Sequence, residues 1–445
     1  MTTVSSGTEY DVFAGQTSNG IHVQTGGTLV AFSGGTISNT IFDGAGDVEL
    51  SGGTAIGTVV QAGGLEGVFN GATDRSAFVS GGTIDDIGGT VSGAFIVLGT
   101  NNIEAGTSIS TTIHSNSKET VGYYGIASGT RVNGGEEDVF GSAVDVVVSG
   151  TGVQIVGAGG ISFDTVILPH NDTDFIDNRE FVSSGGVASG TMVTGVGAAL
   201  SVYDGGTTVS AQVLSFGLTD LSGGTAIATT LVGSESYQQL YVGTAIGTIV
   251  SSGAAENVFS GTTSNTIVLS GGLQENDGGV TINTKISNGG TGTVTNFGLA
   301  SGTQIFSGGV LNVGGTARGT IVFGGGLESV TGGGASGSIV TSGGTQTISA
   351  GGMAYNATIS NGAIQNDYGS ANITTLNGIQ FVFGTANNTT VSSGGVEVIE
   401  SGGTGGFIVS AGGTFNVLAG GTATGGGVLS GGFVQDLWHD KRRHC

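Results

Sequence analysis

The chain has 445 residues, of which 93 are Gly and one is Pro, and its formal net charge is −23. Hydrophobic residues make up 37% and charged residues 9%, which excludes a disordered chain, because disorder couples low hydrophobicity to high charge. Collagen is excluded because it needs Gly at every third position and abundant Pro. With 9 Lys plus Arg against 32 Asp plus Glu, the chain lacks the basic clusters that bind nucleic acids and anionic membranes.

Pairs of glycines recur along the chain at a regular spacing. Near the N-terminus they begin at Gly26, Gly34, Gly52 and Gly63, and near the C-terminus at Gly394, Gly402, Gly412, Gly420 and Gly431. A full unit reads SGGTAIGTVVQAGG from Ser51, and similar units start at Ser222 and Val242. Every second glycine pair recurs after about 18–20 residues, which is the signature of a repeat architecture.

Each unit contains two short runs typical of β-strands and two glycine turns. Examples of such runs are TIVL at Thr266 and FIVS at Phe407, and no segment has the apolar period of a helix. A single unit cannot bury its apolar face, whereas stacked units can. The sequence therefore predicts an all-β fold, a right-handed parallel β-helix (solenoid) with coils of about 18–20 residues. An array of β-sandwiches is the less favoured alternative, because sandwich turns are longer and less regular.

Two segments interrupt the repeats. One contains the single Pro of the chain and many acidic residues, and the other contains the single Trp and a basic tail that ends in the single cysteine, Cys445. We therefore expect four regions: β-helix repeats in 1–160, a non-repeat insertion or lateral loop in 161–182, β-helix repeats in 183–432, and a C-terminal cap or tail in 433–445.

The predicted insertion holds a group of charged side chains that forms a candidate contact loop: His170, Asp172, Asp174, Asp177 and Arg179. Paired carboxylates there could serve as acid and base on a glycosidic bond. Enzymes of that kind need basic residues to hold acidic sugars, and this loop offers one arginine. We therefore expect a loop that contacts a partner. We expect no catalytic residue, no cofactor-binding residue, no metal ligand and no enzymatic activity.

Acidic residues also keep a preferred phase within the repeats. The motif Gly-Gly-x-Glu-x-Val, with small variations, places acids at Glu66, Glu137, Glu256, Glu328 and Glu397. A constant spacing of 19 residues separates the members of a possible acidic ladder: Asp47, Glu66, Asp85 and Glu104. We expect these acids to stack on a solvated outer face that keeps the protein soluble. The alternative is a weak ladder of divalent cations, which prefer carboxylate oxygens.

The units at Ser51 and Gly243 resemble the strand-loop-strand repeats of the passenger regions of AIDA-type autotransporter adhesins, over Thr2 to Gly432. The resemblance implies a right-handed β-helix, surface display, and adhesion or self-association. In some of these adhesins heptose modifies Ser and Thr of the repeats, which implies possible glycosylation at Thr54, Thr58, Thr225 and Thr244. The chain departs from the family pattern because it shows neither a translocator barrel nor a secretory signal at its start.

These observations predict a bacterial adhesin-like passenger, at the cell surface or extracellular and associated with the outer membrane. It would act in cell adhesion or self-association through a glycine-rich, β-helical repeat structure. The expected partners are a second copy of the chain or glycans of a host or matrix surface, with no nucleic acid, no cofactor and no transmembrane segment in this chain. The alternative function is a polysaccharide lyase or glycoside hydrolase with a β-helix fold.

Overall fold

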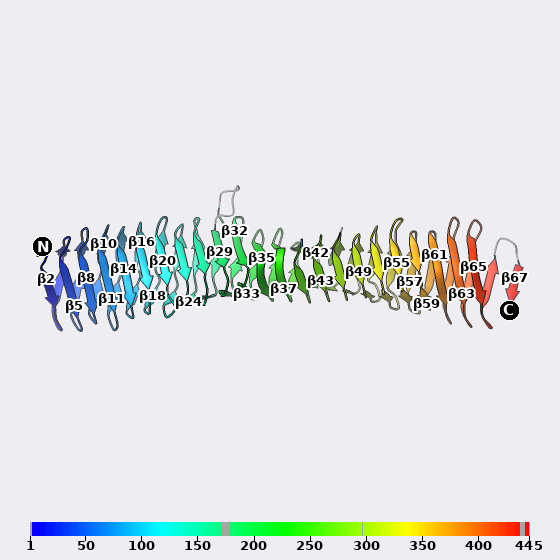
Figure 1. Cartoon of the computed structure of the whole chain (residues 1–445), viewed down its shortest axis with the longest axis horizontal. Coiled ribbons are helices and arrows are strands. Elements are labelled where there is room, and N and C mark those ends of the chain that lie inside the picture. The colour runs from blue at the N-terminus through cyan, green and yellow to red at the C-terminus, as the bar shows by residue number, and fades with distance from the viewer. Residues whose placement is uncertain (1, 171–177, 296, 437–440, 445) are drawn as a thin grey trace. The chain divides into compact units, whose positions relative to one another are not determined.

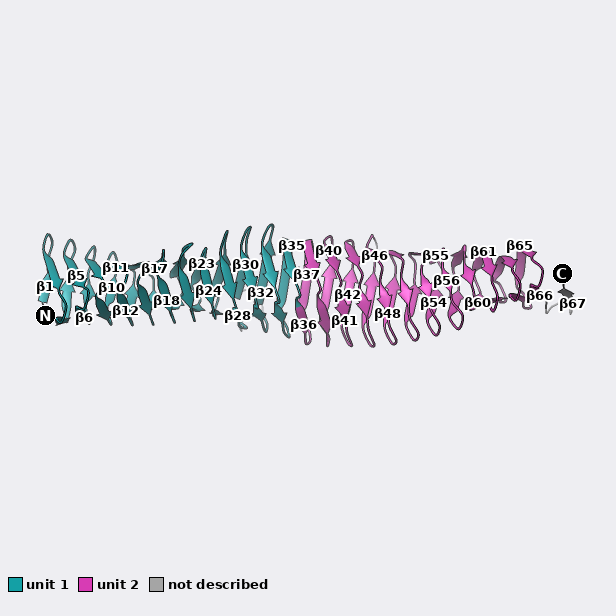
Figure 2. Ribbon diagram, turned by 90° about the horizontal axis from the view of Figure 1, so that it is seen from below, with its two compact units in different colours: residues 1–229 teal, residues 230–445 magenta. Residues whose placement is uncertain are grey.

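A computed structural model describes residues 2–170, 178–295, 297–436 and 441–444. Every regular element in these ranges is a β-strand (Figure 1). Within the same ranges there is no helix long and apolar enough to cross a membrane. The chain divides into two compact units, Met1–Thr229 and Thr230–Cys445 (Figure 2).

Most coils contain three strands. In the first coil these are β1 (Thr2–Val4), β2 (Glu9–Val12) and β3 (Thr17–Asn19). Each pairs in parallel with the strand three places further along the chain: β1 with β4, β2 with β5 and β3 with β6. Repetition of this rule builds three parallel sheets, which we call sheets 1, 2 and 3. The predicted parallel β-solenoid is confirmed, but the prediction of two strands per unit is wrong.

In the first unit, sheet 1 continues through β4 (Ile21–Val23), β7 (Ile41–Phe42), β10 (Val59–Gln61), β13 (Phe78–Ser80), β16 (Phe95–Val97), β19 (Thr112–His114), β22 (Arg131–Asn133), β25 (Val147–Ser149), β28 (Val166–Ile167), β31 (Met192–Val193) and β34 (Gln212–Val213). Sheet 2 contains β5 (Thr28–Phe32), β8 (Asp47–Ser51), β11 (Leu65–Phe69), β14 (Thr83–Ile87), β17 (Thr100–Ile103), β20 (Lys118–Val121), β23 (Glu136–Val139), β26 (Val153–Val156), β29 (Asn178–Val182) and β32 (Ala198–Tyr203). Sheet 3 contains β6 (Thr36–Ser38), β9 (Thr54–Ile56), β12 (Thr73–Arg75), β15 (Thr90–Ser92), β18 (Thr107–Ile109), β21 (Ile126–Ser128), β24 (Ser142–Val144), β27 (Ile161–Phe163), β30 (Val187–Ser189) and β33 (Thr207–Val209). The long β35 (Leu218–Ile227) runs through sheets 2 and 3.

In the second unit, β37 (Tyr237–Ile246) again runs through sheets 2 and 3. Sheet 1 contains β36 (Thr230–Val232), β38 (Ile249–Ser251), β41 (Ile267–Val268), β44 (Lys285–Ile286), β47 (Gln304–Ile305), β50 (Ile321–Val322), β53 (Ile339–Val340), β56 (Thr358–Ile359) and β59 (Thr375–Leu376). Sheet 2 contains β39 (Ala255–Val258), β42 (Leu273–Asn276), β45 (Thr291–Val294), β48 (Val310–Val313), β51 (Leu327–Val330), β54 (Thr345–Ile348), β57 (Ile364–Asp367), β60 (Ile379–Val382), β62 (Val396–Ile399), β64 (Thr414–Val417) and β66 (Phe433–Asp436). Sheet 3 contains β40 (Thr262–Ser264), β43 (Val280–Ile282), β46 (Leu299–Ser301), β49 (Thr316–Arg318), β52 (Gly334–Ser336), β55 (Met353–Tyr355) and β58 (Ser370–Asn372). Three strands run through sheets 3 and 1, namely β61 (Thr385–Val391), β63 (Thr404–Val409) and β65 (Thr422–Val428).

The length of a coil varies along the chain. The offset between paired residues is 19 for Thr2 and Ile21, but 15 for Ile364 and Ile379 and 26 for Val166 and Met192. The longest coil contains the predicted insertion. That insertion is narrower than 161–182, because β27, β28 and β29 pair with the strands of the coils before and after them. At the C-terminus, β67 (Lys441–His444) pairs antiparallel with β66.

The glycine pairs have two separate physical causes. The first residue of a pair, such as Gly34, has φ of +76°, in the left-handed region that favours glycine. At the second residue, Gly35, a Cβ would lie 2.3 Å from the carbonyl oxygen of Val12 in the preceding coil. The same division holds for Gly412 and Gly413. The corner between strands therefore needs the first glycine for its dihedral angle and the second for the close approach of the next coil.

Alternate residues of each strand point inward and form the core. Val, Ile, Leu and Ala dominate these positions in both units. The second position of the sheet 2 strands is different, because it carries a column of polar side chains. In the first unit, one in-register series consists of Asn101, Glu119, Glu137, Gln154 and Glu180. The second unit has two such series: Gln238, Glu256 and Gln274, and further along Glu328, Gln346, Gln365, Gln380 and Glu397. These side chains are buried.

The acids of the Gly-Gly-x-Glu-x-Val motif were predicted to face solvent, and this prediction is wrong. Five such acids are fully buried: Glu66, Glu137, Glu256, Glu328 and Glu397. The acid occupies the second residue of a sheet 2 strand, and the alternation of the strand turns that residue inward. The regular position of these acids in the repeat does place them on a common face, but that face is the inner one.

Buried hydroxyl and amide groups satisfy several of these carboxylates. Glu256 accepts four hydrogen bonds: from Gln238 at 3.1 Å, Thr263 at 3.1 Å, Thr266 at 2.9 Å and Gln274 at 2.7 Å. Burial raises the pKa of Glu256, and the hydrogen bonds to its carboxylate counteract the rise. The hydrogen-bonded column is thus an alternative to an entirely apolar core.

Substitution of Thr266 tests the contribution of this column to stability. Thr266→Val removes one donor to Glu256, and we expect a loss of about 1–3 kcal/mol in the free energy of unfolding, because a buried acceptor loses a partner. Thr374 provides a matched control, because it is also buried and directly precedes a sheet 1 strand, but its Oγ1 has no hydrogen-bond partner in the described part of the chain. Thr374→Val should be close to neutral in urea unfolding, and equal losses in both variants would contradict this account.

The first unit also contains buried acids with few partners. Glu66, Asp74 and Asp86 are fully buried. Glu66 accepts a hydrogen bond from Thr58 at 2.8 Å, and Asp86 accepts one from the backbone N–H of Gly89 at 2.8 Å. The remaining oxygen of each lacks a partner in the described residues, as do both carboxylate oxygens of Asp74. Burial raises the pKa of Asp74 and of Asp86 to about 7, and that of Glu66 well above its usual value.

These raised pKa values predict a protein that is more stable in mild acid. The folded state binds protons that the unfolded state releases, so the stabilisation is complete below about pH 4 and is lost as the pH rises through about 7. Asp74→Asn with Asp86→Asn should reduce the slope of unfolding free energy against pH between 4 and 8. The control Glu9→Gln changes an exposed acid and should leave the slope unchanged. A wild-type slope that is flat or rises with pH would refute the prediction.

Candidate functional site

The outward positions of sheet 3 form a column of threonines in the first unit. Its members are Thr17, Thr36, Thr54, Thr73, Thr90 and Thr107, and each pairs in register with the next. Parallel strands lie about 4.8 Å apart, so the hydroxyl groups repeat at that interval. The side chains are half-buried or exposed. The column is thus a regular array of hydroxyl and methyl groups on the sheet, and we call it the threonine column.

The four predicted glycosylation residues fall into two classes. Thr54 lies in the threonine column, and Thr225 and Thr244 occupy the same position of sheet 3 in their own coils, where they pair with Thr207 and Thr262. Thr58 is fully buried and donates its hydrogen bond to Glu66, so its hydroxyl is not available to a modifying enzyme. The first threonine of the repeat motif therefore faces outward, and the second faces the core.

The predicted acidic ladder does not form. Glu66 pairs with Val48 and Ile84 and points inward. Asp47 occupies the first position of its strand, Asp85 the third position of β14, and Glu104 follows the end of β17. The coils in this region are 17 or 18 residues long in sheet 2, so a constant spacing of 19 shifts the residue by one or two positions per coil. Glu66 therefore lies on the inner face, and the other three acids occupy different positions of their coils, so the four do not form a column.

The structure describes two of the five residues of the predicted contact loop. The backbone N–H of His170 donates to the carbonyl oxygen of Val196 at 2.9 Å. The Arg179 guanidinium carbon lies 5.6 Å from the centroid of the Phe181 ring, and its Nη1 donates to Ser201 at 3.5 Å. Three further members, Asp172, Asp174 and Asp177, lie outside the described residues. The loop stays a prediction.

Outward aromatic pairs are a feature that the sequence analysis missed. The rings of Phe13 and Phe32 stack at 5.1 Å, those of Tyr241 and Phe259 at 5.2 Å, those of Phe306 and Phe323 at 4.9 Å and those of Tyr368 and Phe383 at 4.6 Å. Each pair joins equivalent positions of neighbouring coils. The signal in the sequence is the return of an aromatic residue after one coil length, as for Phe13 and Phe32.

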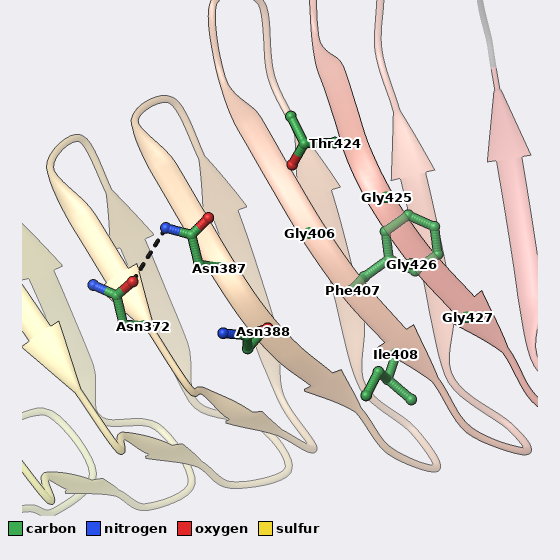
Figure 3. Close-up of a pocket in the computed structure, with 10 residues that line it drawn as sticks. All are labelled: Asn372, Asn387, Asn388, Gly406, Phe407, Ile408, Thr424, Gly425, Gly426 and Gly427. Atoms are coloured by element: carbon green, nitrogen blue, oxygen red, sulfur yellow. Dashed lines mark hydrogen bonds between the residues drawn. The ribbon is translucent and has the colours of Figure 1, made fainter.

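A groove in the second unit was also missed. It has a volume of about 600 Å³, and Figure 3 shows the ten residues that line it: Asn372, Asn387, Asn388, Gly406, Phe407, Ile408, Thr424, Gly425, Gly426 and Gly427. No charged side chain is among them. Within the described residues, no group of three or more His, Cys, Asp and Glu side chains is placed to hold a metal ion.

Comparisons with known proteins find similar chains among the solved structures. No family model matches the chain, and no curated protein matches it. One of the similar solved structures is the crystal structure of a TibA55-350 fragment that was hyper-glycosylated by TibC. Its sequence is 26% identical to this chain, and the match covers 76% of this chain and 94% of the fragment, with a TM-score of 0.33. Because this TM-score is low, the assignment of the fold rests on the strand pairing of the chain itself.

Proposed function

We propose that the protein is an adhesin-like passenger, at the cell surface or extracellular, that acts in cell adhesion or self-association. The observation that carries the proposal is the threonine column, which presents the same side chain in register from coil to coil. Each threonine could make one weak polar contact with a partner. Many weak contacts along a regular surface add to a strong interaction through multivalency. The expected partner is a second copy of the chain or a glycan-coated surface.

The polysaccharide-active alternative depends on acids of the predicted contact loop. Asp172, Asp174 and Asp177 lie outside the described residues, so no geometry favours catalysis there. The proposal of an adhesive role does not depend on that loop, because the threonine column belongs to coils that precede it.

A clumping assay on displayed protein tests the adhesive role. Bacteria that display the chain should sediment faster than bacteria without it. Thr54→Arg with Thr90→Arg introduces long cationic side chains into the threonine column and should reduce clumping severalfold. The control pair Gln24→Arg and Gln61→Arg adds the same charge at exposed positions near sheet 1. The proposal is refuted if the wild-type chain neither clumps cells nor binds any glycan-coated surface.

We further propose that sugars modify outward threonines and leave inward ones unmodified. After co-expression with a protein heptosyltransferase, mass spectrometry of the peptides should find heptose on Thr54, Thr225 and Thr244. Thr58 should be unmodified, because its hydroxyl is buried against Glu66. Modification of Thr58 in the folded protein, or an unmodified threonine column, would contradict this division.

A further inference from the structure

We propose that the groove formed by β61, β63 and β65 in the second unit binds a neutral saccharide. The inference names the ligand chemistry for the adhesive role proposed above and rests on that role for its biological purpose. The binding itself requires no cell and is tested separately. It depends on four features of the groove: an opened corner, fixed amide groups, glycines without a packing cause, and the absence of charge in its lining.

The corner between sheets 3 and 1 is opened here by irregular pairing. In β61, Asn387 and Asn388 lie between two paired residues, where β63 has the single residue Gly406. In β65, Thr424 and Gly425 stand opposite that same Gly406. Such bulges leave the extra residues without partners in the bulged pair and bend the strand. Asn387 keeps its partner on the other side, Asn372 of β58. Three successive coils share the irregularity, which creates a groove across them (Figure 3).

The amide groups at one end of the groove are held in place. Asn387 Nδ2 donates to Asn372 Oδ1 at 3.1 Å, and Asn372 Nδ2 donates to Ser370 Oγ at 3.0 Å. Each asparagine amide offers two donors and an acceptor oxygen with two lone pairs, so these bonds leave groups for a ligand. Asn388 is exposed and has φ of +57°. Oriented amides next to one another suit the alternating donors and acceptors of vicinal hydroxyl groups.

Two glycines of the groove lack a packing cause. A Cβ on Gly427 would meet no atom within 4 Å, and φ of this residue is not in the left-handed region. A Cβ on Gly406 would meet its nearest atom, Thr424 Oγ1, at 3.6 Å, which is an ordinary contact. Neither the fold nor the dihedral angle thus requires glycine at these positions. The missing side chains instead leave space above the strand for a ligand.

The lining also indicates which ligand fits. The groove lining has no charged side chain, although the chain has a formal charge of −23. No side chain of the lining could therefore neutralise the charge of an ionic ligand. Ile408 is 45% exposed and offers an apolar surface to the C–H groups of a sugar ring. The volume of about 600 Å³ lies within the range of small-molecule sites. A neutral sugar of one or two rings meets these requirements.

Saturation-transfer NMR on the full chain tests the inference, with lactose, cellobiose and N,N′-diacetylchitobiose as neutral probes and sialyllactose as the charged probe. We expect binding of one or more neutral sugars and weaker binding of sialyllactose. Gly427→Leu fills the groove, and Asn388→Gly removes an amide while it preserves the left-handed angle. Each should weaken binding about tenfold or more, which is about 1.4 kcal/mol.

Matched controls lie elsewhere in the second unit. Gly334 is also in a strand, and a Cβ there would meet nothing within 4 Å, so Gly334→Leu tests the effect of an added side chain. Asn356 has φ of +55°, so Asn356→Gly tests the loss of an amide at such a corner. Both controls should bind as the wild type does.

The inference is overturned if no neutral probe binds, if both groove variants bind normally, or if sialyllactose binds as well as its neutral parent. Clumping that persists in Gly427→Leu would leave the adhesive role intact and place it at the threonine column. If the wild-type chain neither clumps cells nor binds a glycan-coated surface, but still binds a free neutral sugar, the adhesive role is refuted and the sugar site in the groove stands.

Discussion

In-register hydrogen bonding between successive coils is the constraint on which the rest of the structure depends. A parallel ladder keeps each strand in fixed phase with the strand one coil later, so a residue type that recurs at the coil length becomes a column. On the outside this produces the threonine column of sheet 3. On the inside it produces the Glu and Gln column of sheet 2. Both the threonine column and the acidic interior follow from one geometric rule.

The acidic interior changes how the charge of the protein is understood. The formal value of −23 counts every carboxyl group as ionised. Burial, however, raises the pKa of Glu66 and Glu137 well above the usual value and that of Glu397 to about 8. With a pKa of about 8, Glu397 is therefore mostly protonated at neutral pH. The surface of the folded protein is less negative than its composition indicates.

Much of the fold was predictable from the sequence, whereas the direction of individual side chains was not. The glycine pairs and alternating apolar residues identified stacked β-coils, because both features follow from local geometry. The direction of Glu66 and Thr58 depends on where a strand begins relative to its corner, and the sequence indicated two strands per unit instead of three. The acidic ladder failed because coil lengths vary. The groove was missed because bulges such as that at Asn387 and Asn388 arise from a mismatch between neighbouring coils.

A disulfide between neighbouring coils tests the central claim of in-register stacking most directly. Thr73 and Thr90 pair in register, and adjacent parallel strands are close enough for a disulfide, whereas Val91 points to the opposite face. With Cys445 replaced by Ser, the variant with cysteines at 73 and 90 should form an intramolecular disulfide almost completely under mild oxidation. The variant with cysteines at 73 and 91 should not. The stacked register would be contradicted if both variants formed the disulfide to the same extent, or if neither variant formed it.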